Sequence, residues 1–507
     1  MPSDDQQDSI HFLTNPASHA QAGAVETIDT HISRIFLVGD RAYKMKRAIQ
    51  LPYADFSTPA LRRAACDKEI ELNGRTAPKI YLGVRHITRE ADGSVAFDGR
   101  GELIDAVVEM QRFEQSALLD RMAQADALSP ALMTATARNI AAFHSDLAAV
   151  HGGSGADNMR AVLDINRAGF ATSTLFEQQA IDALEASSRA ALAHHAGLLD
   201  QRERAGKVRR CHGDLHLRNI CVLDGEPCLF DCIEFNERIA TIDVLYDLAF
   251  LLMDLWHRGL PEYANLVMNR YLDASDDEAG VVLLPFFMAV RATIRAHVTA
   301  TQVAEDGDAK GKLEAQARAY FALAESLLHQ HPARLIAIGG LSGSGKTTIA
   351  EALAAHVGAA PGARIVESDR VRKALHAVPA ETRLPDSAYR PEVSAQVYHA
   401  MVARAGRVLA AGGPVVANAV FDRLEDREWI AQAAVAQERP FLGVWLDANH
   451  GLLRQRVDQR RGGPSDATVA VLEQQLEKNV GAMHWRRLDA AASPADIVRD
   501  ILALPLS

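Results

Sequence analysis

The sequence predicts a mixed α/β protein with an α+β domain in its N-terminal part and an α/β domain with a parallel sheet in its C-terminal part. The chain has 507 residues, too many for one hydrophobic core. A strand–turn–strand pattern near residue 40 leads into a long helical stretch, as in an antiparallel sheet followed by helices. Near residue 340 a buried strand, a glycine-rich turn and a helix follow one another, as in a parallel arrangement. We place the domains at residues 1–330 and 334–507, and divide the first into lobes of about 20–112 and 113–330.

Composition and charge limit the classes of function. Hydrophobic residues make up 48% of the chain and charged residues 23%, as in ordinary globular proteins. The net charge of −11 argues against a nucleic-acid partner, which needs a basic surface. The polar start of the chain lacks the pattern of a signal peptide, and the apolar runs Val281–Val290 and Ile242–Trp256 are short or broken by aspartates. We therefore expect a cytoplasmic protein with no membrane partner.

The five cysteines form no CxxC pair and no disulfide framework. A zinc site from the last four, with His212 and His216, is the alternative, but their spacing matches no usual ligand pattern. We expect buried, reduced thiols.

The first predicted sheet begins with a hairpin that carries two lysines. Arg34–Val38 is an apolar strand, Gly39-Asp40 is a turn signal, and Arg41–Met45 is the return strand. The return strand reads Arg-Ala-Tyr-Lys, which matches the V-A-I-K pattern of a strand whose lysine holds nucleotide phosphates. The register favours Lys44 for that role. Lys46, on the same face, is the alternative.

A helix over Pro59–Asn73 follows and carries Glu69 and Glu71. One of them should pair with the strand lysine, because an ion pair fixes the lysine tip. Bacterial proteins with a similar E-x-x-L-N sequence favour Glu69 by resemblance. The strand Ala106–Phe113 then runs into a polar break that resembles the hinge between kinase lobes. That resemblance implies adenine contacts from the backbone of Glu109, Met110 and Gln111.

The stretch Arg210–Asn236 carries the strongest pattern of the N-terminal part. His212-Gly213-Asp214 is followed by Asn219 five positions after the aspartate, as in the pattern H-x-D-x-x-x-x-N. The apolar pair Leu229-Phe230 then precedes Asp231, which is expected at the end of a strand. Phosphoryl transfer needs a carboxylate that orients the attacking hydroxyl and oxygen ligands for magnesium, and this spacing supplies both.

The stretch resembles the aminoglycoside phosphotransferase/choline kinase group, whose loop typically reads H-G-D-x-H-x-x-N. The resemblance implies a two-lobed, protein kinase-like fold. It also implies that Asp214 is the base or orients the acceptor hydroxyl, that Asn219 and Asp231 bind magnesium, and that Asp247 braces the loop. Glu234 and Asn236 follow closely, and we expect them to face the acceptor or the metal. Only fifteen residues separate Asp231 from Asp247, and no A-P-E sequence follows. This favours a small acceptor over a peptide.

A second motif begins after the break at His331-Pro332. The predicted strand Leu335–Ile338 runs into GLSGSGKT, a full Walker A match, and a helix follows. In such a loop, backbone N–H groups cradle phosphates, the lysine reaches the β- and γ-phosphates, and the threonine binds magnesium. The residues expected to bind nucleotide here are Gly340, Ser342, Gly343, Ser344, Gly345, Lys346, Thr347 and Thr348.

The C-terminal part resembles small P-loop kinases of the gluconate kinase, chloramphenicol phosphotransferase and zeta-toxin type. Its Ser368–Arg372 matches their strand-end S-D-x-x-R. This implies that Asp369 is the catalytic base, or else holds magnesium-bound water, and that Arg372 contacts substrate or phosphate. Relatives often read V-V-x-D-A-x-F where this chain has Asn418. An amide can bind substrate but cannot act as a base.

The segment Leu452–Gly463 resembles a lid. Arg456 and Arg460 lie four apart on one predicted helical face, with Arg461 beside them, and lid arginines neutralise charge on a transferred phosphoryl group. An exposed basic helix is the alternative.

Two hypotheses follow for the whole chain. The first is a bifunctional phosphotransferase with two sites that use ATP or GTP and Mg²⁺ to phosphorylate small hydroxylated molecules. Bacterial proteins that join these domains in this order support it by resemblance. The second is a single active kinase domain regulated by a nucleotide-sensing second domain. No feature of the sequence defines the oligomeric state.

Overall fold

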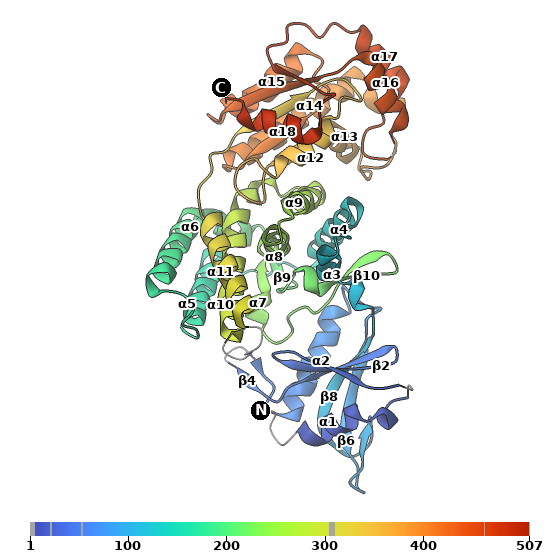
Figure 1. The fold of residues 1–507 in the computed structure, drawn as a ribbon, viewed down its shortest axis with the longest axis vertical. Helices are drawn as coiled ribbons and strands as arrows, with labels where there is room; N and C mark the ends of the chain where they lie inside the picture. Colours follow the sequence, from blue (N-terminus) through green and yellow to red (C-terminus); the bar gives the residue numbers. More distant parts are fainter. Residues whose placement is uncertain (1–5, 21–22, 52–53, 304–309, 461, 506–507) are drawn as a thin grey trace. The chain divides into compact units, whose positions relative to one another are not determined.

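The computed structural model describes residues 6–20, 23–51, 54–303, 310–460 and 462–505 (Figure 1). Its contacts divide the chain into two compact units. Unit 1 comprises residues 1–155 and 201–251, and unit 2 comprises residues 156–200 and 252–507. The helices after residue 251 thus group with the C-terminal sheet. The domain boundaries given above stay a prediction.

Unit 1 contains a six-stranded antiparallel sheet. In spatial order its strands are β1 (Glu26–Asp29), β2 (Ser33–Val38), β3 (Arg41–Lys46), β8 (Glu102–Gln111), β6 (Tyr81–Arg89) and β7 (Val95–Phe97). The predicted hairpin is confirmed as β2–β3, with Phe36 opposite Tyr43. Helix α2 spans Pro59–Asn73 as predicted. It starts where Thr58 Oγ1 accepts a hydrogen bond from Leu61 N and proline occupies the first helical position.

The other described elements of unit 1 are helices and three small antiparallel sheets, of which one pairs β4 (Gln50–Leu51) with β5 (Ala54–Asp55). The hairpin of β10 (Ile220–Leu223) and β11 (Glu226–Leu229) pairs Ile220 with Leu229. β9 (Val208–Arg210) pairs with β12 (Thr241–Asp243), at the start of helix α8 (Val244–His257). The other named elements are α1 (Gln7–Thr14), α3 (Leu119–Gln124), α4 (Pro130–Asp146) and α7 (Glu237–Ala240).

Unit 2 combines helices with a five-stranded, all-parallel sheet. The strands follow the order β14 (Arg364–Glu367), β15 (Val415–Asn418), β13 (Leu335–Gly339), β16 (Phe441–Asp447) and β17 (Arg486–Asp489). The helices that accompany the sheet are α12 (Lys346–Ala354), α13 (Ser368–Leu375), α14 (Pro391–Ala410), α15 (Leu424–Val435), α16 (His450–Gln459), α17 (Val469–Glu477) and α18 (Pro494–Ala503). The antiparallel and parallel sheets confirm the predicted fold class.

The helices that precede this sheet include one long apolar segment. They are α5 (Gly155–Phe170), α6 (Gln178–Arg204), α9 (Pro261–Ser275), α10 (Leu284–Gln302) and α11 (Lys310–Leu327). The helical segment Glu278–Gln302 is long and apolar enough to cross a membrane by length and composition. However, 72% of its most apolar window is buried inside the protein, as in a core helix.

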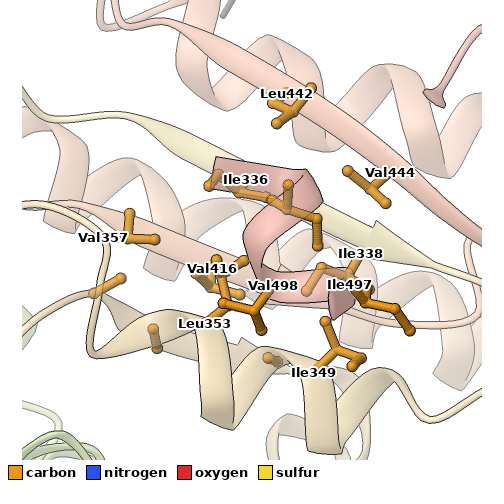
Figure 2. Packing of buried hydrophobic residues seen from close by; sticks show 14 of the residues in the cluster. Ile336, Ile338, Ile349, Leu353, Val357, Val416, Leu442, Val444, Ile497 and Val498 are labelled. Atoms are coloured by element: carbon orange, nitrogen blue, oxygen red, sulfur yellow. The ribbon is translucent and has the colours of Figure 1, made fainter. Parts of the chain in front are cut away.

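The core of the parallel sheet lies on both of its faces, because alternate residues of a strand point to opposite sides. Ile336 and Ile338 of β13 pack with Ile349 and Leu353 of α12 and with Ile497 of α18 (Figure 2). On the other face Leu335 and Ala337 pack against residues of α14 and α15. This packing fixes the carboxyl ends of the strands, where ligands bind in parallel α/β sheets.

Candidate functional site

The two strand lysines of unit 1 share one buried glutamate. Lys44 and Lys46 lie on the same face of β3, as their spacing predicted. Glu69 of α2 lies with Oε1 2.8 Å from Lys44 Nζ and with Oε2 2.5 Å from Lys46 Nζ. Glu71 instead pairs with Lys68 at 3.1 Å on the exposed face of α2. The expected lysine–glutamate ion pair is therefore present, and it involves Glu69.

At Glu69 and Lys44, the attraction of the opposite charges outweighs the effect of burial on the pKa. Burial disfavours the charged form of Glu69, but Lys44 and Lys46 lower its pKa to about 2. Burial likewise opposes the charge of Lys44, while Asp231 and Glu69 hold its pKa well above the usual value. The ammonium of Lys44 is thus kept charged at neutral pH, as a phosphate contact requires.

Glu234 belongs to the same buried cluster, where its carboxylate contacts Lys46. Burial, the largest influence, raises its pKa despite the attraction of Lys46. The position of Glu234 close after Asp231 predicted a contact with the acceptor or the metal. Its carboxylate is buried and paired with Lys46 inside the lobe, which argues against a contact with the acceptor.

The β10–β11 hairpin brings the two predicted magnesium ligands together. Asn219 precedes β10 and Asp231 follows β11, and Phe230 N donates to Asn219 O at 3.0 Å. Asp231 has the left-handed φ of 64° and a partly exposed carboxylate, with Oδ1 2.5 Å from Lys44 Nζ. A non-glycine residue in this region of φ is uncommon and occurs often at functional sites. The turn therefore aims Asp231 at the lysine that is expected to hold phosphate.

The loop around Asp214 is held from two sides. Asn219 Nδ2 donates to Asp214 Oδ2 and to Asp214 O, each at 2.9 Å. Asp247 accepts hydrogen bonds from the backbone N–H groups of His212 and Gly213 at 3.1 and 2.8 Å. Asp247 thus braces the loop, as the resemblance implied, and Asp214 keeps a partly exposed carboxylate.

The three residues predicted to contact adenine through their backbone lie at the end of β8. Glu109 and Met110 lie inside β8, between β3 and β6, and Gln111 N donates to Ile80 O at 2.7 Å. The backbone of this stretch is thus engaged in the sheet. The side chain of Glu109 approaches Tyr43, on the face opposite Lys44, whereas Met110 is buried in the cluster that includes Phe230.

In unit 2 the Walker A residues form a turn between β13 and α12. Gly340 has φ 147°, and a Cβ there would lie 2.6 Å from Ser344 Oγ and 2.7 Å from Leu446 O. Gly343 and Gly345 have φ 85° and 86°. These positions require glycine, and the turn leads directly into the first turn of α12, which is the arrangement that binds phosphate in such motifs. Ser342 N donates to Gln475 Oε1 at 2.9 Å, and Thr348 is exposed in the first helical turn.

Lys346 and Thr347 begin α12 and lie in the lining of a large cavity. Lys346 Nζ donates to Leu341 O at 3.0 Å within the same turn. Burial lowers the pKa of Lys346 to about 8, although nearby Asp369 and Glu367 favour its charged form. Thr347 Oγ1 donates to Glu367 Oε1 at 2.6 Å.

Glu367 was not among the residues predicted from the sequence. It ends β14 directly opposite Asn418 of β15, and Asn418 Nδ2 lies 3.4 Å from Glu367 Oε1 and 3.5 Å from Thr347 Oγ1. Asn418 Oδ1 is buried and makes no hydrogen bond within the described part of the chain. The sequence carried one signal for this role of Glu367: it is an acidic residue at the end of an apolar strand, immediately before Ser368-Asp369. Glu367 supplies the carboxylate at the strand ends that Asn418 does not.

The cavity has a volume of about 1150 Å³ and collects the other predicted residues of unit 2. Asp369 lies in its wall, where burial and Glu367 raise the pKa of its carboxyl group. Arg372 donates to Ala388 O at 2.6 Å and stacks over Tyr389. The cavity is also lined by Lys346, Thr347, Asn418, Arg456 and Arg460.

The two lid arginines both contact backbone carbonyl groups. Arg456, on α16, donates to Ala490 O at 2.9 Å, and Arg460, just beyond α16, donates to Ala467 O. Arg461 lies outside the described residues.

Comparison with known proteins divides the chain in the same way as the two motifs. Residues 82–281 match the family model of the phosphotransferase enzyme family, and residues 335–479 match that of the AAA domain. The chain is a fusion of two kinase-type domains. We call them the phosphotransferase-family domain and the P-loop domain. They support phosphotransferase activity and nucleotide binding.

The fusion has relatives of the same length. An uncharacterised protein of Mycobacterium tuberculosis (strain ATCC 25618 / H37Rv) is 27% identical over 478 residues, or 92% of each chain. Among solved structures, a choline/ethanolamine kinase family protein from Mesorhizobium loti covers 63% of this chain and 93% of its own, with 15% identity and a TM-score of 0.41. A gluconokinase from Sinorhizobium meliloti 1021 covers 34% of this chain and 92% of its own, with 26% identity and a TM-score of 0.23.

Proposed function

We propose that the protein is a bifunctional phosphotransferase with two separate sites for ATP and magnesium, each of which phosphorylates a hydroxyl group of a small molecule. One observation carries the proposal: each of the two sites has its own lysine and its own carboxylate. In unit 1 Lys44 Nζ lies 2.5 Å from Asp231 Oδ1. In the P-loop domain Lys346 is followed by Thr347, which is hydrogen-bonded to Glu367.

The donor groups at both sites suit magnesium, which prefers oxygen ligands and keeps part of its water shell. Asn219 and Asp231 would hold it in the first domain. Thr347 would hold it in the second, with Glu367 orienting the threonine hydroxyl, and the unpartnered Asn418 Oδ1 is suited to accept a hydrogen bond from metal-bound water. When bound, magnesium neutralises charge on the β- and γ-phosphates.

The protein groups at each site divide the remaining tasks. Lys44 holds phosphate oxygens in the first domain. Asp214 orients the acceptor hydroxyl and takes its proton, while Asn219 fixes the Asp214 carboxylate through the hydrogen bond of 2.9 Å. In the P-loop domain Lys346 binds phosphate. Asp369, whose pKa is raised by burial and by Glu367, is suited to accept the hydroxyl proton.

The walls of the P-loop cavity favour a small acceptor that carries an anionic group. The cavity lining includes the arginines Arg372, Arg383, Arg390 and Arg423, alongside the carboxylates of Asp386, Asp422, Asp426 and Asp466. Guanidinium groups bind carboxylate and phosphate oxygens in a bidentate manner. We further propose that the protein works in the cytoplasm, where ATP and such acceptors are available.

Separate inactivation of the two sites tests the function. A library of small hydroxylated metabolites is offered with γ-labelled ATP to the wild type, Asp214→Ala and Lys346→Ala. Each substitution should abolish one set of labelled products and spare the other. Asp224→Ala, an exposed carboxylate at the tip of the β10–β11 hairpin, is the control and should spare both.

One outcome would favour the alternative of a regulatory second domain. If Lys346→Ala leaves every product in place and changes only the ATP concentration required, the P-loop domain senses nucleotide instead of transferring phosphate. If neither substitution removes any product, the proposed function is wrong.

A further inference from the structure

The outer edge of the parallel sheet is covered by a helix from the phosphotransferase-family domain. Helix α9 lies within the match at residues 82–281, whereas β14 lies within the P-loop match. Asn265 Nδ2 donates to Pro361 O and Ala363 O at 2.9 and 3.0 Å. Asn269 Oδ1 accepts from Ile365 N at 2.7 Å. Side chains of α9 therefore form hydrogen bonds with backbone N–H and C=O groups that an edge strand would otherwise leave without a partner.

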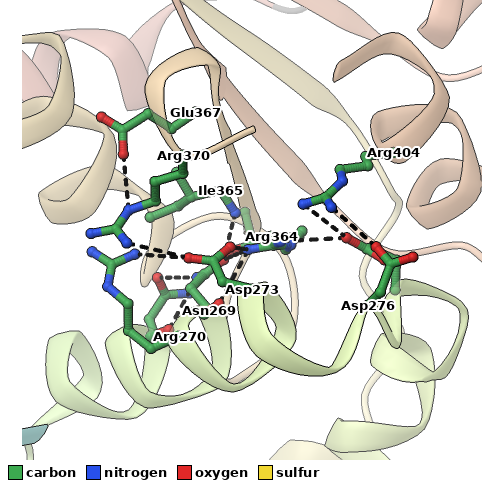
Figure 3. Close-up of polar contacts among 12 residues, drawn as sticks. Asn269, Arg270, Asp273, Asp276, Arg364, Ile365, Glu367, Arg370 and Arg404 are labelled. Carbon is green, nitrogen blue, oxygen red and sulfur yellow. Dashed lines mark hydrogen bonds and ion pairs between the residues drawn. The ribbon is translucent and has the colours of Figure 1, made fainter. Parts of the chain in front are cut away.

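Charged residues continue this interface toward the nucleotide site. Arg364 is fully buried, and its Nη1 lies 2.8 Å from Asp273 Oδ1 while its Nη2 lies 3.3 Å from Glu278 Oε1 (Figure 3). Both carboxylates come from the phosphotransferase-family match. Burial opposes the charge of Asp273, but Arg364, Arg370 and Arg270 together keep its pKa below the usual value. Asp273 is therefore held as a carboxylate among arginines.

Three consecutive contacts connect Asp273 to the Walker A threonine. Asp273 Oδ2 lies 3.5 Å from Arg370 Nη1, and Arg370 Nε lies 3.0 Å from Glu367 Oε2. The other oxygen of Glu367 accepts the hydrogen bond from Thr347 Oγ1 at 2.6 Å. Arg370 thus contacts one oxygen of Glu367 and leaves the second for Thr347. Figure 3 shows the guanidinium of Arg370 between Asp273 and Glu367.

We propose that Asp273 is a positioning residue for the P-loop site, contributed by the neighbouring domain, and that it acts through Arg370 to orient Glu367 beside Thr347. The proposal rests on the proposed function, because it concerns the magnesium-dependent nucleotide site of that domain. The guanidinium of Arg370 lies within ion-pair distance of both Asp273 and Glu367, so its charge couples the positions of the two carboxylates. Residues that orient a metal site without touching the metal commonly change metal affinity when replaced. The P-loop site is thus completed by α9.

Magnesium dependence of ATP binding provides the test. The full chain carries Asp231→Asn to silence the phosphotransferase-family site, and ATP binding is followed by calorimetry as Mg²⁺ is titrated. In this background Asp273→Asn should raise the Mg²⁺ concentration for half-maximal binding about tenfold. At saturating Mg²⁺ the amount of ATP bound should be unchanged. Asp273→Glu, which keeps a carboxylate, should restore most of the Mg²⁺ affinity.

Asp276→Asn is the matched control. Asp276 lies at the same end of α9 and contacts Arg404 and Arg407 of α14 at 3.2 and 3.5 Å, but not Arg370 or Glu367. It should leave the Mg²⁺ requirement unchanged. An equal shift in both variants, or no shift in Asp273→Asn, overturns the proposal.

Two further measurements keep the test decisive. If Asp273→Asn does not fold, as judged by its melting temperature, Arg370→Lys takes its place. This change retains the charge and removes the guanidinium, so the same Mg²⁺ shift is expected, and its absence contradicts the proposal. Lys346→Ala in the same background must abolish ATP binding. If it does not, the failure lies with the proposed function and not with the role of Asp273.

Discussion

Thr347 Oγ1 donates a hydrogen bond of 2.6 Å to Glu367 Oε1. This bond joins the last residue of the Walker A motif to the carboxyl end of the edge strand β14. Glu367 is nearly fully buried, so the orientation of the threonine hydroxyl depends on a carboxylate that the protein interior holds in place.

Replacement of Glu367 by glutamine should weaken magnesium-dependent ATP binding at the P-loop site. The amide keeps the size of the side chain but loses the negative charge, and such changes around a metal site cost roughly 10- to 100-fold in affinity. Calorimetric titration of Mg²⁺ in the Asp231→Asn background measures the effect. Asp447→Asn, at the exposed end of β16 in the same sheet, should change nothing.

ATP affinity at the P-loop site should fall as the pH rises above about 8. Burial lowers the pKa of Lys346 to about 8, so the free protein loses this positive charge above that pH. Phosphate binds the charged form, so affinity should drop by at most about tenfold for each further pH unit. Dissociation constants measured from pH 7 upward in the Asp231→Asn background would show the decline. Lys346→Arg, which stays charged, should give a flat profile. A flat profile for lysine itself would contradict the prediction.

Local sequence signals predicted the parts of both sites that are formed by neighbouring residues. The β2–β3 hairpin, helix α2 and the Walker A turn appear where the pattern placed them, because a turn signal, an N-cap and obligatory glycines each determine local backbone geometry. Glu69 was distinguished from Glu71 by resemblance. The structure supplies the physical reason, since Glu69 faces the sheet and Glu71 faces solvent.

Contacts between distant segments were not predictable in this way. The strand that contains Gln111 was predicted, but the acceptor of its N–H, Ile80 O, was not, because no local pattern shows that partner. The importance of Glu367 depends on its distance to Thr347, and that of Asp273 on Arg370, about a hundred positions away in the chain. These relationships exist only after the elements have packed.

Loss of the Glu69 carboxylate should destabilise unit 1. Glu69→Gln leaves Lys44 and Lys46 buried without their shared counter-charge, and breaking a buried ion pair costs about 3–5 kcal/mol. The free energy of unfolding, measured by urea denaturation, should fall accordingly for the transition of this unit. Glu71→Gln removes only an exposed pair and should cost less than about 1 kcal/mol. Equal losses in the two variants would contradict the buried-cluster account.

The contribution of Glu69 should also depend on pH in a defined direction. Its folded-state pKa of about 2 lies below the usual value of 4.5, so its stabilising contribution is fully present above pH 4.5 and declines as the pH falls toward 2. The difference in stability between the wild type and Glu69→Gln should therefore shrink over this interval. A difference that stays constant down to pH 2 would be inconsistent with the lowered pKa.

Substitution of Asn418 by aspartate should increase the dependence of the P-loop domain on magnesium. The new carboxylate would lie about as close to Glu367 as the present amide, which is 3.4 Å away, and two like charges there repel each other. Without Mg²⁺ the variant should melt at a lower temperature than the wild type. With Mg²⁺ and ATP it should regain more stability than the wild type does. An identical response of both proteins to Mg²⁺ would argue against a metal near the ends of β14 and β15.

The number of ATP molecules bound per chain tests the central claim of two separate sites most directly. Calorimetry with Mg²⁺ present should give two ATP per wild-type chain and one for each of the variants Asp231→Asn and Lys346→Ala. The double variant should bind none. A wild-type chain that binds one ATP, or a single substitution that removes both, would contradict the account.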